Sequence, residues 1–220
     1  MQYPLLLAAL LMVCSATVSA ASFNCTRAKS KVEKAICSDN ELSLLDEDLA
    51  KVYKSALKQH PVKGYVLARQ RDWISLNQYC DPKGFVPCLK KEYKKRIAQL
   101  SDIETLEIYT NSDNFSYEGG DAVAEIRKIG AKYLIDVWGG FRIHMQATRD
   151  NGRPTYTGCE FEGIFSTPSG GVAISTEYPD FKFVFKIKGK TLSYNDSRQI
   201  CGGFGDLPEF LQRVDQRKGP

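Results

Sequence analysis

The chain has 220 residues, of which 43% are hydrophobic and 25% are charged, and its formal net charge is +4. These values are typical of a soluble globular protein, and they exclude a disordered chain, a collagen-like fibre and a membrane bundle. The two histidines leave few ligands for a His-rich metal site and few candidates for a general base.

The first twenty residues have the pattern of an export signal. Leu5 to Val13 form an apolar run, and small residues follow it from Ser15 to Ala21. The run is too short to cross a membrane, which takes about 20 apolar residues, and Val18-Ser19-Ala20 suits cleavage after Ala20. We therefore expect residues 1–20 to be a signal peptide and the mature protein to be periplasmic or secreted, without stable membrane insertion. A short buried N-terminal helix is the alternative.

The cysteine positions predict a disulfide framework. Cys14 would be lost with the signal peptide, which leaves an even number of cysteines in an exported protein. The chain has no CxxC motif, and no histidine stands close to a cysteine, so we expect no metal site and no cofactor. The cysteines that remain are Cys25, Cys37, Cys80, Cys88, Cys159 and Cys201.

Residues 22–100 have the periodicity of amphipathic helices. Leu42, Leu45, Leu49 and Val52 recur at spacings of three and four residues. A capping-box pattern at Ser30 and Glu33 predicts a helix from Lys31. Further helices are expected from about Asn40 to His60, from Tyr65 to Tyr79 and from Leu89 to Leu100.

After Ser101 the apolar period becomes two, which predicts strands, as in 122–126, 133–137 and 181–187. Turn signals separate the strands, and the chain offers no helices for parallel crossovers. The sequence therefore predicts an α+β protein: a helical bundle at 22–100 followed by a small antiparallel β-barrel or sandwich at 101–220. The turn signals are Gly119-Gly120, Gly139-Gly140, Asn151-Gly152, Ser169-Gly170-Gly171 and Gly189.

The net charge is divided unevenly between these two segments. Residues 22–100 carry +7 and residues 101–220 carry −3. Such a dipolar molecule would steer charged partners to either end. We expect no nucleic acid, because no stacking motif accompanies the basic residues.

Geometry favours disulfides within each segment. In one continuous helix Cys25 and Cys37 would lie about 18 Å apart, too far for a bridge, but a helix that begins at Lys31 lets Cys25 fold back. Cys80 and Cys88 enclose a short segment with two prolines and a glycine, which favours a local bridge. Cys159 and Cys201 would then join two strands. This is one of 15 possible connectivities.

The helical segment resembles a known family. The stretches SFNCTRAKSKVEKAICSDNELSLLDEDLAKVYKSAL, QRDWISLNQYC and CLKKEYKKRIAQL are similar to the N-terminal domain of the LprI-type lysozyme-inhibitor family. The resemblance covers about Ser22 to Leu100 and implies an exported, helical, disulfide-braced domain, whose namesake inhibits lysozyme. We interpret Trp73 and Tyr93 as core aromatics, and Asp46 with Arg96 as a buried pair that fixes helix packing. The C-terminal half matches no family by specific motifs.

Catalytic chemistry is the weaker hypothesis. Glu160 and Glu162 could form a glycosidase pair, but their spacing of two is equally that of the solvent face of a strand. His60 and His144 stand in no nucleophile motif. We therefore expect a binding protein and no enzyme.

Two loops are candidates for binding a target. In the Cys80–Cys88 loop, Lys83 and Gly84 would enter the acidic cleft of a lysozyme, and Phe85 would add an apolar contact. Ser169 and Gly170 lie in a polar turn between strands and form the second candidate. The expected function is inhibition of lysozyme. The alternatives are an immunity or scaffolding protein that binds another envelope protein, and a glycan-active enzyme.

Overall fold

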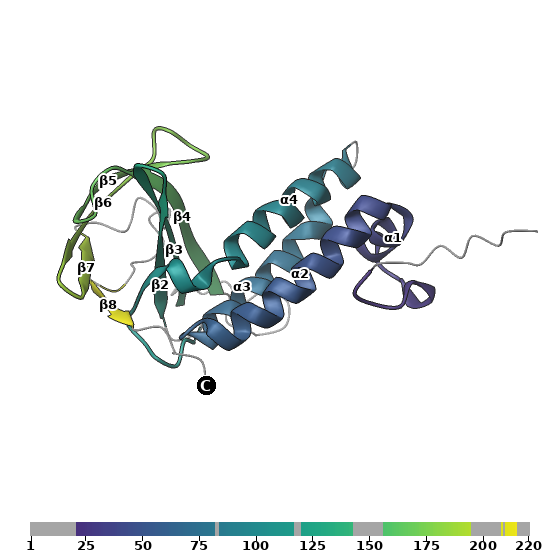
Figure 1. The fold of residues 1–220 in the computed structure, drawn as a ribbon, viewed down its shortest axis with the longest axis horizontal. Coiled ribbons are helices and arrows are strands. Elements are labelled where there is room, and N and C mark those ends of the chain that lie inside the picture. Colours follow the sequence, from purple (N-terminus) through teal and green to yellow (C-terminus); the bar gives the residue numbers. More distant parts are fainter. Residues whose placement is uncertain are drawn as a thin grey trace, which may run out of the picture.

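The computed structural model describes residues 21–81, 84–116, 120–142, 156–194, 208 and 210–214. Within these residues four α-helices come first and a β-barrel follows them (Figure 1), which confirms the predicted α+β class. The helices are α1 (Lys31–Ser38), α2 (Asn40–Gln59), α3 (Lys63–Leu76) and α4 (Phe85–Leu100), with 3₁₀ turns η1 (Cys25–Arg27), η2 (Asn77–Tyr79) and η3 (Ile103–Thr105).

Local capping fixes where the helices begin, as the sequence predicts. The Ser30 hydroxyl accepts a hydrogen bond from the Glu33 amide at 3.0 Å, and the Glu33 carboxylate accepts one from the Ser30 amide at 2.8 Å. Asp39 caps α2, which ends just before His60. Helix α4 begins at Phe85, one turn earlier than predicted, because Pro87 falls in its first turn, where proline's missing N–H has no intrahelical partner to lose.

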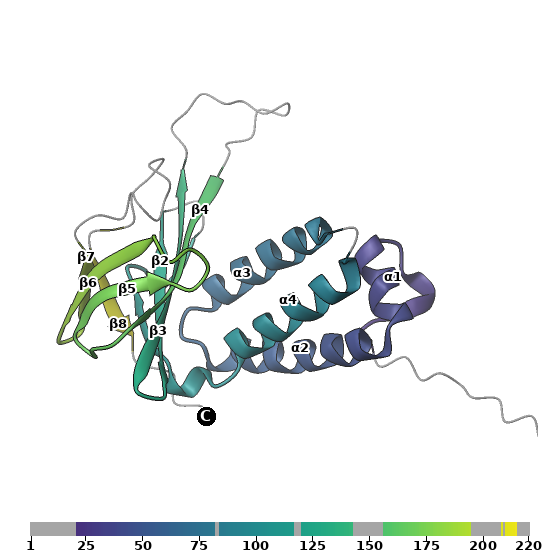
Figure 2. The same cartoon turned by 90° about the horizontal axis from the view of Figure 1, so that it is seen from above.

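Helices α2 and α4 run side by side, and α1 lies at their end remote from the barrel (Figure 2). The two predicted local disulfides are present there. Cys25 and Cys37 have Cα atoms 5.7 Å apart, as do Cys80 and Cys88. Cys159 is buried and disulfide-bonded, and its predicted partner Cys201 lies outside the described residues.

The sheet closes into a barrel in which each strand pairs antiparallel with the next, and β8 pairs with β1. Of the two predicted architectures, it is therefore a barrel. Alternate side chains point inward, and they fill the interior with aromatic and aliphatic groups such as Tyr109, Phe161 and Phe183. The strands are β1 (Glu107–Thr110), β2 (Ala122–Ile129), β3 (Lys132–Arg142), β4 (Tyr156–Phe165), β5 (Gly170–Ser175), β6 (Lys182–Lys188), β7 (Thr191–Tyr194) and β8 (Phe210–Val214).

One predicted turn is wrong. Gly139 and Gly140 lie inside β3, where they pair with Cys159 and Gly158 of β4. Glycine occurs inside strands, for example where another backbone approaches closely, as well as in turns. A Gly-Gly pair alone therefore does not identify a turn. The turn at Gly189 is confirmed, with a left-handed φ of 62°. The predicted turn at Asn151-Gly152 and position Gly119 lie outside the described residues.

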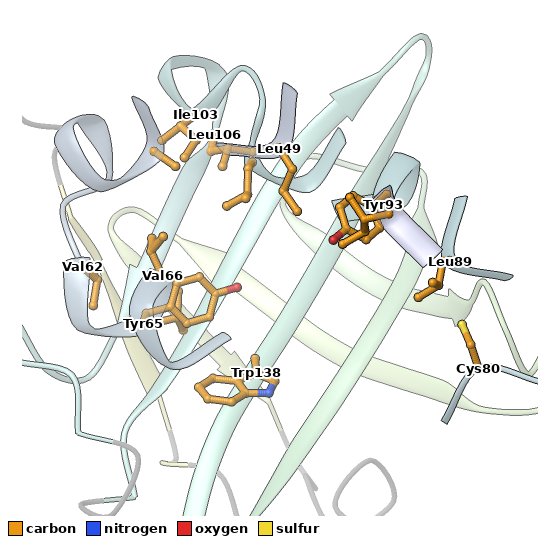
Figure 3. Close-up of a cluster of buried hydrophobic side chains, with 14 of the residues drawn as sticks. Leu49, Val62, Tyr65, Val66, Cys80, Leu89, Tyr93, Ile103, Leu106 and Trp138 are labelled. Carbon is orange, nitrogen blue, oxygen red and sulfur yellow. The ribbon is translucent and has the colours of Figure 1, made fainter. Parts of the chain in front are cut away.

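The helices pack on the outer face of β1, β2 and β3. Tyr65 of α3 lies close to Trp138 of β3 (Figure 3), with ring centroids 5.8 Å apart, and Val66 belongs to the same apolar cluster. Val123 of β2 and Ile108 of β1 point to the same side and are fully buried. One apolar cluster thus includes residues of both predicted segments, so the helices and the barrel share a core.

A barrel residue also completes a helix. The Arg127 guanidinium of β2 donates hydrogen bonds to the carbonyls of Ala98, Gln99 and Ser101, at 2.9, 3.3 and 3.1 Å. These carbonyls belong to the last turn of α4 and the residue after it, where intrahelical partners are missing. The C-terminal end of α4 therefore depends on β2 for its hydrogen bonds.

The predicted signal peptide and His144 lie outside the described residues. Among the helices that are described, none is long and apolar enough to cross a membrane.

Candidate functional site

The first predicted loop lies at the corner between η2 and α4, at the end of the helices remote from the barrel (Figure 2). Gly84 caps α4 and accepts a hydrogen bond from the Cys88 amide at 2.8 Å. Phe85 is buried, and the ammonium of Lys31 lies 3.7 Å from its ring centroid. Phe85 therefore packs within the protein and does not offer the apolar contact that we predicted. Lys83 lies outside the described residues.

Exposed apolar side chains surround this corner instead. Ile74 and Leu76 at the end of α3 are 59% and 61% exposed, and Tyr79 is 75% exposed. All three precede Cys80, whose disulfide fixes the chain. The corner thus presents a rigid apolar surface made by residues other than Phe85.

The second predicted loop is the turn between β4 and β5, on the barrel. Ser169 is exposed, whereas Gly170 is buried and has φ of 92°. A Cβ atom on Gly170 would lie 2.6 Å from the carbonyl oxygen of Phe185, so only glycine fits there. Both residues line a surface hollow of about 390 Å³. The two predicted loops therefore belong to different parts of the molecule and form two separate surfaces.

A third site, which the sequence did not predict, lies where the helices meet the barrel. Arg69, Asp72 and Trp73 of α3 face Arg96 of α4 and Glu160 of β4 across a cavity of about 340 Å³. We call this cavity the junction groove. The indole of Trp73 also packs edge-on against Tyr93, with ring centroids 4.8 Å apart, so its position is fixed by the helical core.

Two buried charged residues, Arg69 of α3 and Asp136 of β3, join the helices to the barrel, and Arg69 also lines the junction groove. The Arg69 guanidinium lies 3.0 Å from Asp136 Oδ2 and 2.9 Å from Glu160 Oε1. Burial raises the pKa of Asp136 to about 7, against the opposing attraction of Arg69. Among the described residues Asp136 Oδ1 has no hydrogen-bond partner, which explains why desolvation outweighs the ion pair for this carboxyl. Arg69 itself stays protonated, because Asp136 and Glu160 offset its burial.

Arg96 is held by two amides, and this corrects the predicted pair with Asp46. Arg96 Nε donates to Gln70 at 3.0 Å and Nη1 donates to Gln99 at 3.3 Å. The Asp46 carboxylate accepts instead from the Tyr93 hydroxyl at 3.1 Å and from the Ser22 hydroxyl at 2.6 Å. Both charges are buried as predicted, but their hydrogen bonds go to neutral groups, so they do not form an ion pair.

A second polar contact between helices and barrel involves His60. Its Nδ1 accepts from the Val62 amide at 3.0 Å, and its Nε2 lies 3.0 Å from Glu125 Oε1 of β2. The Tyr65 hydroxyl donates to the other oxygen of Glu125 at 3.2 Å. The pKa of Glu125 lies below its ordinary value, because the contact with His60 and the nearby Arg69 and Arg96 outweigh its burial. His60 is thus a buried structural residue, which agrees with its lack of a catalytic motif.

Sequence reasoning missed the junction groove because its parts are distant in the chain. Arg69 and Asp136 are separated by 67 positions, and in a strand with alternating apolar residues Asp136 has the pattern of a solvent-facing position. The one available signal was the pair Glu160 and Glu162, which do lie on the outer face of β4. The described part of the chain contains no cluster of three or more His, Cys, Asp or Glu residues that could hold a metal ion.

Comparison with known proteins supports the resemblance found in the sequence. The chain is 31% identical over 84 residues to the protein named lipoprotein LprI from Mycobacterium bovis and from two strains of Mycobacterium tuberculosis, CDC 1551 and H37Rv. The match covers 36% of this chain and 41% of each relative. No family model matches the chain, and no solved structure matches it. The chain is therefore similar to LprI over about a third of its length.

Proposed function

We propose that this protein is an exported, non-enzymatic binding protein that inhibits a lysozyme. The observation that carries the proposal is the similarity to LprI, together with the two bridges of the helical segment, which agree with the disulfide-braced domain that the resemblance implies. Glu160 and Glu162 support the non-enzymatic part. Glu160 pairs with Arg69, and Glu162 accepts from the Thr176 hydroxyl at 2.8 Å, so both carboxylates serve structural contacts.

The corner between η2 and α4 is the binding surface that we favour. The Cys80–Cys88 disulfide and the capping of α4 fix the described residues on both sides of it, so we expect little conformational entropy to be lost on binding. Lys83 would supply a cation for the carboxylates of the lysozyme cleft, and Gly84 would allow close approach. Leu76 and Tyr79 replace Phe85 as the apolar contacts, because they are exposed beside the disulfide.

A lysis assay tests this proposal. Mature protein is added to lysozymes of several classes acting on cell walls, and we expect turnover to slow. Lys83→Glu should weaken inhibition about tenfold, which corresponds to about 1.4 kcal/mol of binding free energy. The matched control is Lys54→Glu, a charge reversal at an exposed position in the middle of α2, which should inhibit like the wild type.

Other outcomes would redirect or overturn the proposal. If Lys83→Glu inhibits fully and Ser169→Glu does not, the binding surface is the β4–β5 turn. If no lysozyme class is bound, the inhibitor function is wrong, and binding to another envelope protein becomes the better hypothesis. If the protein alone releases soluble fragments from purified walls, it is a glycan-active enzyme.

A further inference from the structure

The junction groove contains two buried hydrogen-bond donors that no described residue satisfies. Arg96 is 4% exposed, yet its Nη2 has no partner within the described part of the chain, and the same holds for Trp73 Nε1. Leaving a buried donor unsatisfied costs about 1–3 kcal/mol, and more when the donor is charged. Both side chains line the groove. A ligand with hydrogen-bond acceptors would satisfy these two donors.

The geometry of Arg96 favours a carboxylate as that acceptor. Gln70 and Gln99 hold two of its three nitrogens, so the guanidinium is fixed in place and Nη2 remains available. Nη2 carries part of the positive charge of the guanidinium, and a carboxylate oxygen is the acceptor that forms the strongest hydrogen bond with a charged donor. Arg69 is not available for the same role, because Asp136 and Glu160 already occupy it.

The remaining walls of the groove restrict the rest of the ligand. Asp72, Glu92 and Glu177 line the same cavity together with Lys95, so acidic groups stand next to the cations in its wall. An ammonium group next to the carboxylate would be attracted by these acids. Leu76 and Trp138 add apolar wall, and a volume of about 340 Å³ suits a molecule of one or two residues.

We propose that the junction groove binds a small zwitterion, an α-amino acid or short peptide, whose carboxylate is held by Arg96 and Trp73. The groove shares Leu76 with the corner proposed to bind lysozyme but is otherwise made of other residues, and its test does not depend on the lysozyme function. Free amino acid and peptide present the same carboxylate, and they are distinguished by which one binds more tightly.

The wild-type protein with four small probes provides the first test. The chain has only two tryptophans, so their indole N–H signals in a ¹H–¹⁵N NMR spectrum are easily followed. Racemic alanine or alanyl-alanine should shift the Trp73 signal at a dissociation constant of about 1 mM or tighter. Alaninamide, which lacks the carboxylate, should not shift it, and N-acetylalanine, which lacks the ammonium, should bind at least tenfold more weakly.

Sulfate at matched ionic strength is the control for a general anion site. If sulfate shifts the Trp73 signal as strongly as alanine, or if alaninamide binds as well as alanine, the proposal is wrong. The absence of any shift with alanine and alanyl-alanine would overturn it equally. These outcomes come from the unmodified protein and do not depend on whether a variant folds.

Two substitutions then test the named donors by titration calorimetry. Trp73→Phe keeps an aromatic ring against Tyr93 and removes the N–H, and Arg96→Lys keeps the charge but removes the fork. Each should raise the dissociation constant at least tenfold. Lys91→Gln, at an exposed position on α4, should leave it unchanged. Unaltered affinity in both donor variants would show that the ligand binds elsewhere.

Discussion

Asp136 shows how much a single buried group costs at the junction between helices and barrel. Its carboxyl is 7% exposed and only one of its oxygens is hydrogen-bonded within the described residues. Because its pKa is raised from an ordinary value of 3.8 to about 7, the folded protein binds a proton that the unfolded chain releases between these two values. The negative form of Asp136 is therefore tolerated in the fold only at an energetic cost.

This assignment predicts how stability depends on pH. Between about pH 4 and pH 7 the folded state holds more protons at Asp136, so the free energy of unfolding should fall as pH rises, by up to about 1.4 kcal/mol per pH unit from this group. Asp136→Asn keeps the shape and cannot titrate, so it should remove this slope. Urea denaturation across the pH range measures the effect.

Glu125 has a lowered pKa, so its contribution makes stability rise with pH at lower pH. Because Glu125 is present in both the wild type and Asp136→Asn, the difference between their pH profiles reports Asp136 alone. Parallel pH profiles of wild type and Asp136→Asn would contradict the assignment.

At the scale of elements, the start of α3 is held against the loop that follows β1. A Cβ atom on Gly64 would lie 2.7 Å from the carbonyl oxygen of Phe115, and the Phe115 ring stacks on Trp138 with centroids 5.5 Å apart. The helix therefore approaches this loop as closely as its backbone allows, and a larger side chain would push the two apart.

Gly64→Ala should destabilise the protein by about 1–3 kcal/mol, the usual cost of overpacking, although alanine favours a helix more than glycine does. Chemical denaturation gives the value. Gly84→Ala is the matched control, because no described atom lies within 4 Å of the added methyl group, and it should cost less than about 1 kcal/mol. Equal effects at the two positions would show that the contact with Phe115 is not tight.

The Cys80–Cys88 disulfide is a second feature at this scale. It closes a loop with a sequence separation of 8, and the chain-entropy estimate for such a loop is about 2–3 kcal/mol. The double variant Cys80→Ala, Cys88→Ala should lose about this much stability, as measured by its thermal unfolding. If the corner binds lysozyme, inhibition should weaken as well. A variant of unchanged stability would mean that packing alone holds the corner.

For the whole molecule, the division of charge has a role that the sequence did not reveal. The acidic groups Glu125, Asp136 and Glu160 of the barrel meet His60 and Arg69 of the helices. Some of the charges that we expected to attract a partner therefore form contacts between the helices and the barrel. Together with the shared apolar cluster, this predicts that the two halves unfold together.

The two tryptophans test cooperativity directly, because Trp73 lies in α3 and Trp138 lies in β3. Trp138→Phe leaves a reporter in the helices, and Trp73→Phe leaves one in the barrel. In each variant, urea midpoints from tryptophan fluorescence and from far-ultraviolet circular dichroism should coincide. Within either protein, two separated midpoints would show that helices and barrel are independent domains.

The features that could be predicted from the sequence are those that depend on contacts between residues close together in the chain. The start of α1 depends on Ser30 and Glu33, three positions apart, so its capping box is visible in the sequence. Closure of the barrel depends on pairs such as Ile108 with Val214, and no local pattern specifies which strands meet. The junction groove could not be predicted for the same reason, since Arg69, Arg96 and Glu160 come from three elements that are distant in the sequence.

The capping of α4 by Arg127 has a consequence for the order of folding. A nascent chain emerges with its N-terminus first, so α4 is available before Arg127 of β2 has been made. Until then the carbonyls of Ala98 and Gln99 lack the guanidinium that binds them in the native state. The last turn of α4 should therefore stay frayed and gain protection from hydrogen exchange only when β2 arrives. Completion of this helix would be a late event in folding, governed by the barrel.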